Sequence, residues 1–258
     1  MRIVRFSDGS SPKYGLLKDD STRVFVLKGD PLFSPAEASG EVFELDEVRL
    51  LSPVIPRSKV VAVGKNYADH VSEMDSEIPE EPILFLKPNT SVIGPDDPIV
   101  LPNWSHHVDH EAELAVVIKT IAKDLSPDEV DDVIFGYTCA NDVSARDKQK
   151  QDGQWTRAKG FDTACPLGPW ITVSDRFDPD NVRITASVDG EVRQDASTAD
   201  MIVPVRELIS FISGVFTLLP GDVILTGTPA GVGPIHPGDR VDVTIEGIGT
   251  LTNPVVRR

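Results

Sequence analysis

The chain has little cysteine and little positive charge. Only Cys139 and Cys165 occur in 258 residues, far from the C-x-x-C spacing of a cysteine metal site. This usage suits a reducing cytosol and leaves a single disulfide open. Lysine and arginine number 25 against 41 acidic residues, so the formal net charge is −16. That charge argues against binding to nucleic acid or to an anionic membrane, and any site for an anionic ligand must be built from local cations.

The sequence also lacks a membrane-spanning run. The longest apolar-looking segment, LISFISGVFTLLP at residues 208–220, is shorter than a membrane span and contains serine, glycine and threonine. The first ten residues, MRIVRFSDGS, carry no apolar segment of a signal peptide. We therefore expect a cytoplasmic protein with no membrane partner.

Strand-like segments outnumber helical ones. Short β segments separated by turn residues fill the first 50 residues, and the proline-bracketed stretch LSPVIPRSK, residues 51–59, reads as a connector. We therefore expect a small N-terminal β domain over residues 1–52 and a larger domain over residues 53–258. Longer apolar strands dominate after the connector, which predicts a β-rich α+β fold.

Four local patterns predict individual elements. Ser126, followed by proline and then by glutamate three residues after the cap, predicts a helix start. Apolar residues at helical spacing predict a helix over residues 205–216. Asp189-Gly190 predicts a hairpin turn. The segment RDKQKQDGQW, residues 146–155, is expected to be a polar loop.

Two glutamates stand at the start of an apolar strand, VDHEAELAVVI at residues 108–118. In an extended chain Glu111 and Glu113 point to the same face, ~7 Å apart. Like charges in a low dielectric require a compensating cation. Asp142 follows another apolar run, and three carboxylates make an all-oxygen site that favours Mg²⁺ or Mn²⁺ over zinc. The spacing alone leaves open a pair of solvent-facing glutamates.

Three nearby histidines offer a zinc alternative. His106, His107 and His110 precede the acidic pair but lack the H-E-x-x-H order of a zinc protease helix. Surface or supporting roles are therefore favoured for them.

Two further segments carry groups that could do chemistry. In GKNYADHVSEM, residues 64–74, His70 and Glu73 would share one helix face, where the carboxylate makes the imidazole a stronger base. Alone, such a pair is usually a surface contact. Lys159 could face a site, although its local sequence favours a surface lysine with a buried stem. Arg146 and Gln149 could reach the same place as Asp142.

A glycine-rich loop, TGTPAGVGP at residues 226–234, follows a strand. It lacks the signatures of a P-loop and of a dinucleotide-binding turn. Its glycines would let backbone N–H groups approach an anion, and Thr226 and Thr228 add hydroxyls. A tight β connection needs the same residue types, so both interpretations stay open.

The combination of these motifs indicates a protein family more specifically than any one motif does. In chain order they are GKNYADHVSE, ILFLKP, VDHEAELAVVI, NDVSARDKQ, WTRAKGFDTACPLGP, LLPGDVILTGTPAGVGP and GDRVDVTIEGIGTL. Over residues 59–258 the chain resembles the fumarylacetoacetate hydrolase superfamily. The resemblance implies a mixed β-roll core behind the small N-terminal β domain, a homodimer, and a small-molecule 2-oxo acid substrate.

The resemblance also implies the site residues. It assigns Mg²⁺ or Mn²⁺ binding to Glu111, Glu113 and Asp142, and it makes Lys159 the active-site lysine. Its substrate-contacting residues would be Arg146, Gln149 and Thr228. The acylpyruvase and oxaloacetate decarboxylase branches place a catalytic His-Glu dyad on a lid, which matches His70 and Glu73.

The function implied is metal-dependent cleavage of a C–C bond in small 2-oxo acids through an enolate, by acylpyruvate hydrolysis or oxaloacetate decarboxylation. One alternative is isomerisation of 2-hydroxyhepta-2,4-diene-1,7-dioate, which moves a proton instead. An alternative of another class is a non-catalytic protein that binds a metal or a 2-oxo acid. The possible base, His70 with Glu73, favours an enzyme, because a binding protein needs no water-activating pair.

Overall fold

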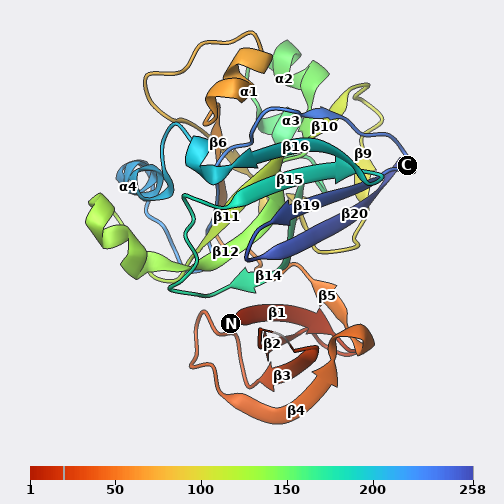
Figure 1. Cartoon of the computed structure of the whole chain (residues 1–258), viewed down its shortest axis with the longest axis vertical. Helices are drawn as coiled ribbons and strands as arrows, with labels where there is room; N and C mark the ends of the chain where they lie inside the picture. Colours follow the sequence, from red (N-terminus) through yellow and green to blue (C-terminus); the bar gives the residue numbers. More distant parts are fainter. Residues whose placement is uncertain (20, 258) are drawn as a thin grey trace.

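The computed structural model describes residues 1–19 and 21–257 and is dominated by β-strands (Figure 1). A large mixed sheet runs in the order β4-β3-β2-β1-β14-β12-β11-β17-β6-β7, with β5 paired to β1 and β8 to β14. Its strands are β1 (Arg2–Ser7), β2 (Lys13–Leu17), β3 (Arg23–Leu27), β4 (Ala38–Glu44), β5 (Arg49–Leu51), β6 (Val60–Gly64), β7 (Ile83–Lys87), β8 (Val92–Ile93), β11 (Ala112–Ile118), β12 (Ile134–Asn141), β14 (Cys165–Thr172) and β17 (Val223–Leu225). The β-rich α+β fold class is confirmed.

Two smaller sheets and short helices complete the described chain. One sheet has the order β16-β15-β19-β20-β9, and the other has the order β13-β10-β18. Their strands are β9 (Ile99–Leu101), β10 (Val108–His110), β13 (Ser144–Ala145), β15 (Arg183–Val188), β16 (Glu191–Ser197), β18 (Gly233–Pro234), β19 (Arg240–Ile245) and β20 (Gly249–Arg257). The helices are α1 (Ala68–Glu73), α2 (Arg146–Asp152), α3 (Thr156–Lys159) and α4 (Val205–Val215), with 3₁₀ turns η1 (Leu45–Glu47), η2 (Asn89–Ser91), η3 (Pro127–Val133) and η4 (Thr198–Asp200).

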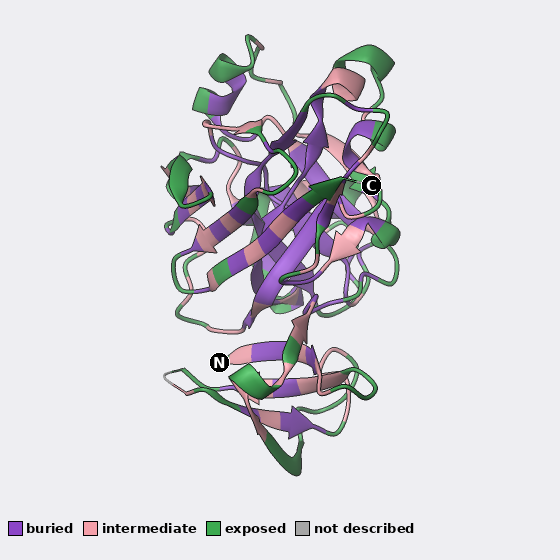
Figure 2. Cartoon of the chain, turned by 90° about the vertical axis from the view of Figure 1, so that its right-hand side faces the viewer, coloured by how far each residue is buried: buried purple, intermediate pink, exposed green. Residues whose placement is uncertain are grey.

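The N-terminal strands form a body of their own at the bottom of Figure 1. They are connected to the rest of the chain through β1, which pairs antiparallel with β14. The outermost strand, β4, is mostly exposed, whereas buried residues fill the central strands of the larger body (Figure 2). The large sheet therefore extends through both bodies, and the boundary expected at residue 52 stays a prediction.

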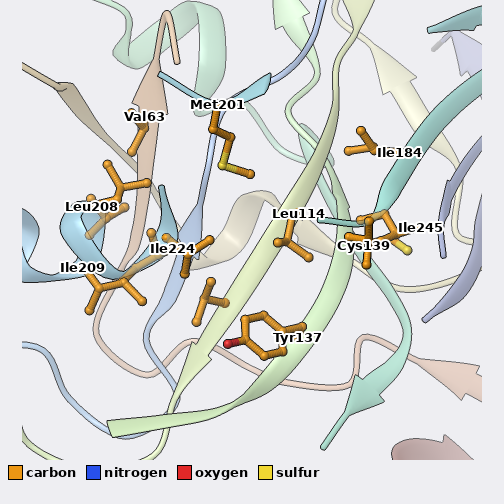
Figure 3. Close-up of a cluster of buried hydrophobic side chains, with 14 of the residues drawn as sticks. Val63, Leu114, Tyr137, Cys139, Ile184, Met201, Leu208, Ile209, Ile224 and Ile245 are labelled. Carbon is orange, nitrogen blue, oxygen red and sulfur yellow. The ribbon is translucent and has the colours of Figure 1, made fainter. Parts of the chain in front are cut away.

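The main core lies between α4 and the central strands. The apolar side of α4 packs onto β6, β11 and β17, as Figure 3 shows for Leu208, Ile209 and Ile224. Strand β11 is buried on both faces: Leu114 and Val116 belong to this cluster, while Ala115 and Val117 belong to a second one. Burial on both faces explains the nearly continuous apolar run of this strand.

Two chain segments cross from one sheet to another at the same place. Strand β10 belongs to the three-stranded sheet and β11 to the large sheet, so Glu111 lies at the junction. Asp142 lies at the matching junction between β12 and β13. The Asp142 N–H donates to the Glu111 carbonyl over 2.9 Å, which holds the two junctions side by side.

Most local predictions are confirmed. Residues 205–215 are helical, and the Asp189-Gly190 hairpin turn has positive φ at both positions. Ser126 starts a helical segment with a capping box, but that segment is the 3₁₀ turn η3. The expectation of a polar loop over residues 146–155 is wrong: α2 occupies residues 146–152 and ends at Gly153, which has a φ of 68°. The polar composition reflects a short helix with one exposed side, which a search for apolar periodicity overlooks.

No helix in the described ranges is long and apolar enough to cross a membrane.

Truncating a buried core side chain should lower the free energy of unfolding more than truncating an exposed side chain. Ile209→Ala removes a fully buried side chain, so we expect it to lower the free energy of unfolding by about 2–5 kcal/mol. Ile121→Ala, at a side chain that is 68% exposed, should change it by less than about 0.5 kcal/mol. Urea denaturation measures both variants. Equal losses would contradict the packing of α4 described above.

Candidate active site

A cavity of about 750 Å³ opens in front of the two strand junctions. Its lining comes from α1, the β6–α1 connection, the β10–β11 junction, α2, α3 and the glycine-rich loop. This volume lies within the usual range for small-molecule sites, ~300–1,000 Å³. The cavity therefore collects segments that are far apart in the sequence.

Three buried carboxylates lie together at this place. Glu111, Glu113 and Asp142 each offer a ligand oxygen, and these oxygens lie within 4.8 Å of one another. All three residues are at most 3% exposed. The alternative of a solvent-facing glutamate pair, which the spacing left open, is therefore wrong, and the structure brings together the three residues that the sequence singled out.

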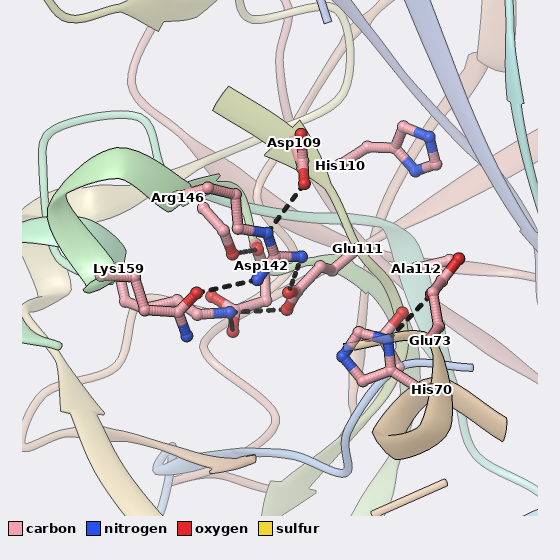
Figure 4. Close-up of polar contacts among 12 residues, drawn as sticks. His70, Glu73, Asp109, His110, Glu111, Ala112, Asp142, Arg146 and Lys159 are labelled. Atoms are coloured by element: carbon pink, nitrogen blue, oxygen red, sulfur yellow. Dashed lines mark hydrogen bonds and ion pairs between the residues drawn. The ribbon is translucent and has the colours of Figure 1, made fainter. Parts of the chain in front are cut away.

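Two cations neutralise part of this cluster (Figure 4). The Lys159 Nζ donates to Glu111 Oε2 over 2.6 Å and to Asp142 Oδ2 over 2.7 Å. Arg146 forms an ion pair with Glu111 Oε1 at 2.5 Å, and its Nε donates to Asp109 over 2.8 Å. Lys159 is only 3% exposed, so the surface-lysine interpretation favoured by its local sequence is wrong.

The glutamates differ in their electrostatic surroundings. Burial disfavours ionisation of Glu111, but the charges of Lys159 and Arg146 outweigh it and hold the pKa of that carboxyl well below its usual range. Burial raises the pKa of Glu113 well above its usual value, and the negative charges of Asp142 and Glu111 raise it further. Within the described ranges Glu113 has no ion pair with lysine or arginine, and its hydrogen bond comes from the Gly227 N–H over 2.7 Å.

The donor set fits a hard divalent cation. Carboxylate oxygens are the ligands preferred by Mg²⁺ and Mn²⁺. The unbalanced charge at Glu113 is the feature that such an ion would compensate. None of the three upstream histidines belongs to the grouped ligands found in the described chain. His110 is fully buried and hydrogen-bonds Gln194 through Nδ1, and burial lowers the pKa of its imidazole.

Lys87 is a site residue that the sequence analysis missed. It is the last residue of β7 and is 1% exposed, and its ammonium contacts both Asp142 Oδ1 and the Lys159 carbonyl. Asp142 is thus held by one lysine on each oxygen. The only sequence signal was a charged residue that closes an apolar strand, ILFLK, which is common at exposed strand ends.

The His-Glu pair lies on α1, as expected from its spacing. His70 Nδ1 is 3.3 Å from Glu73 Oε2, and both residues line the cavity. The Gly231 N–H donates to the Glu73 carboxylate over 3.0 Å. The glycine-rich loop therefore does bring backbone N–H groups to anions, but these anions are the side chains of Glu73 and Glu113.

The three expected substrate-contacting residues also line the cavity. Arg146 Nη1 donates to Gln149 Oε1 over 3.0 Å, so the two side chains form one unit on α2. The Thr228 hydroxyl accepts from Gln194 Nε2 over 2.8 Å. Gln194, also missed, is fully buried on β16, and its Oε1 accepts from the Ala112 N–H. Gln194 thus links the strand junction to the glycine-rich loop.

Comparison with known proteins identifies the class. The model described as fumarylacetoacetate (FAA) hydrolase C-terminal matches residues 59–256, and one described as Rv2993c-like, N-terminal, matches residues 1–53. The chain belongs to the fumarylacetoacetate hydrolase family, and the resemblance inferred from its motifs is confirmed. It is an enzyme of that superfamily.

Particular relatives span nearly the whole chain. Protein Rv2993c of Mycobacterium tuberculosis is 55% identical over 232 residues, which cover 89% of this chain and 85% of that protein. The mitochondrial oxaloacetate tautomerase fahd2 of Xenopus laevis is 38% identical, covering 99% and 90%. The crystal structure of 2-hydroxyhepta-2,4-diene-1,7-dioate isomerase from Mycobacterium marinum has a TM-score of 0.92 and 47% identity, covering 100% of this chain and 99% of that one.

The carboxylate cluster predicts stabilisation by a divalent ion. At a Mn²⁺ concentration of ~100 times Kd, binding should add ~2.7 kcal/mol and raise the Tm by about 5–10 °C. Glu113→Gln should remove this increase and change the Tm of EDTA-treated protein less, because burial and the charges of Asp142 and Glu111 raise the pKa of Glu113 and disfavour its charged form without metal. Differential scanning calorimetry measures both effects.

Glu191→Gln, at an exposed position on β16, is the matched control and should retain the full increase. A Glu113→Gln variant that is stabilised by Mn²⁺ as strongly as the wild type would contradict this assignment.

The raised pKa of Glu113 predicts that metal binding releases a proton. The protonated carboxyl predominates below the raised pKa, and the ion must displace that proton, so Mn²⁺ affinity should fall as the pH is lowered. Titration calorimetry in two buffers of different ionisation enthalpy counts the released protons. A pH-independent affinity without proton release would mean that Glu113 is not a ligand.

Proposed function

We propose that this protein is a divalent-metal-dependent enzyme that converts small 2-oxo acids with a second carbonyl or carboxylate through an enolate. The observation that carries the proposal is that His70, backed by Glu73, lines the same cavity as Lys159 and two of the three clustered carboxylates, Glu111 and Glu113. A base, an ion site and a buried cation in one cavity are the parts that enolate formation requires.

Glu111, Glu113 and Asp142 would hold the ion, Mg²⁺ or Mn²⁺. When bound, the ion acts as a Lewis acid toward the carboxylate and 2-oxo oxygens of the substrate. Lys159, held between Glu111 and Asp142, keeps a positive charge next to the developing negative charge. Desolvation opposes the charged form of Lys159, but the two carboxylates outweigh it and raise its pKa, so it acts as a cation.

The remaining residues position the substrate and move the proton. Arg146 and Gln149 form one hydrogen-bonded unit that would bind the substrate carboxylate, and Thr228 would contact it from the opposite loop. Glu73 orients the His70 imidazole through Nδ1, which leaves Nε2 to accept a proton. The Gly231 N–H fixes Glu73 in turn, so the base is supported by the loop that carries Thr228.

Two kinds of reaction could pass through such an enolate, C–C cleavage and proton transfer. In C–C cleavage, as the sequence predicts, His70 activates water to attack the distal carbonyl of an acylpyruvate, or CO₂ leaves oxaloacetate without water. In proton transfer, His70 would take a proton from C3 of a 2-oxo acid, or from the 2-hydroxyl of a dienol, and the resulting enolate would be reprotonated at another atom. Relatives named oxaloacetate tautomerase and 2-hydroxyhepta-2,4-diene-1,7-dioate isomerase favour proton transfer as the second candidate.

The proposal also covers the substrate, the assembly, the location and the domain boundary of the protein. The site would take a small 2-oxo acid, the protein would form a homodimer in the cytoplasm, and the chain would divide at residues 52 and 53. The binding-protein alternative predicts ligand affinity without turnover.

A substrate panel separates these reactions. Oxaloacetate, acetylpyruvate, fumarylpyruvate and 2-hydroxyhepta-2,4-diene-1,7-dioate are each tested with Mn²⁺ or Mg²⁺ and with EDTA. We expect EDTA-sensitive turnover of at least one of them. Pyruvate release indicates cleavage, whereas exchange of C3 hydrogen for deuterium, or a spectral shift without pyruvate, indicates proton transfer. Silence on all four substrates in metal-loaded protein would count against the proposal.

The proposed role of the His70–Glu73 dyad predicts that replacing His70 slows turnover. His70→Ala should lower kcat about 10²–10⁴-fold, the usual contribution of a general base, while Mn²⁺ affinity changes little. His236→Ala, at an exposed histidine outside the cavity lining, is the control and should keep wild-type turnover. Normal turnover by His70→Ala would show that another group is the base.

A further inference from the structure

Two cavity-lining lysines, Lys65 and Lys150, have no part in the chemistry described above, and Lys150 is the exposed one of the two. Lys65 lies between β6 and α1, and its half-buried side chain lines the cavity together with Ser76. The Lys65 ammonium donates to the Ser76 hydroxyl. Glu111 and Glu113 in the same lining are buried, whereas Lys65 and Ser76 are partly exposed.

The charge of Lys65 is not neutralised by the protein. Arg146, Lys159 and Lys87 each form ion pairs with buried carboxylates. Among the described residues, Lys65 has no carboxylate within ion-pair distance, although acidic residues outnumber basic ones by 41 to 25 in the sequence. An ammonium has three donors, and the hydroxyl of Ser76 uses one of them. Lys65 can therefore donate to an anionic group in the cavity.

The backbone at Lys65 is strained. Its φ is 62°, in the left-handed region that side chains other than Asn, Asp and Gly seldom adopt. Within the described ranges the non-glycine residues with positive φ are Lys65, Asp75, Asp96, Asp124, Thr163 and Asp189. Four of these six are aspartates, which tolerate the conformation. A lysine brings no such local compensation, and strain of this kind often accompanies a role in a site.

Apolar side chains also line the cavity. The Trp155 ring packs against Gly64, where an added Cβ would lie 2.6 Å from it, and Val63 and Val71 also line the cavity. The cavity lining thus combines ion-paired cations, apolar side chains and, at Lys65, an ammonium that no carboxylate of the described residues neutralises. A chain of a few carbon atoms with a carboxylate at each end is complementary to this arrangement.

We propose that Lys65, held by Ser76, binds the distal carboxylate of the substrate, so that the site selects 2-oxo dicarboxylates over 2-oxo monocarboxylates. This inference rests on the proposed function, because the proposed ion site must hold the 2-oxo acid group.

Two ligands of equal carbon number test the inference. 2-Oxoglutarate and 2-oxopentanoate share five carbons and the 2-oxo acid group, and only the former has a distal carboxylate. Titration calorimetry gives the Kd of each ligand for the Mn²⁺-loaded wild-type protein and for Lys65→Met, Lys65→Arg and Lys119→Met. Lys119 is exposed and lies outside the cavity lining, so Lys119→Met controls for the loss of one positive charge from the protein.

We expect the wild type and Lys119→Met to bind 2-oxoglutarate about tenfold more tightly than 2-oxopentanoate, as one charge-assisted hydrogen bond provides. Lys65→Met should lose this preference, mainly through weaker binding of 2-oxoglutarate, and Lys65→Arg should keep most of it. A preference that survives in Lys65→Met, or equal binding by the wild type, would overturn the inference and leave the proposed function intact. If the wild type binds neither ligand, the proposed function fails and this inference fails with it.

A second variant guards against damage to the fold. Lys65→Gly relieves the strain at a φ of 62°, so it should fold at least as well as the wild type and still lose the preference for 2-oxoglutarate. Retention of the preference in Lys65→Gly would contradict the role of the ammonium.

Discussion

The site depends on one electrostatic constraint, the burial of three carboxylates within 4.8 Å of one another. Such a cluster is unfavourable unless cations balance it, because like charges in a low dielectric repel and lose their hydration. Lys87, Lys159 and Arg146 balance Glu111 and Asp142, whereas no lysine or arginine of residues 1–19 and 21–257 pairs with Glu113. The local imbalance at Glu113 makes the cluster suited to a divalent ion and, beyond it, to an anionic substrate.

The fold satisfies this constraint through the positions at which two chain segments cross from one sheet to another. Glu111 and Asp142 lie at two junctions that hydrogen-bond to each other, so their carboxylates lie together, and Glu111 lines the cavity. The cations come from β7, α2 and α3, elements that pack around the junctions. Gln194 and the glycine-rich loop then connect these junctions to the His70–Glu73 pair through hydrogen bonds. Base, cations and carboxylates are therefore fixed relative to one another by buried polar contacts, which are costly to break.

Hydrophobic periodicity and turn residues correctly predicted the elements in which the apolar residues of the pattern are also the buried ones. The helix at residues 205–215 and the Asp189-Gly190 hairpin are examples. The short helix α2 was missed because its stability comes from packing at the cavity and not from an apolar stripe. The exposure of Lys159 was also misjudged from its neighbours, since partners 17 and 48 residues away in sequence decide its burial.

By itself, the sequence determined which side chains could bind an ion or move a proton, because residue chemistry and spacing along one strand or helix are local properties. It thereby named the carboxylates, the dyad, Arg146, Gln149 and Lys159. Only the tertiary structure decided that Lys87 and Gln194 support them and that the loop's N–H groups bind Glu73 and Glu113. It also decided that Lys65 lines the cavity with no carboxylate of the described residues within ion-pair distance. These features depend on contacts between segments distant in sequence, and a buried charge has no local signature that distinguishes it from an exposed one.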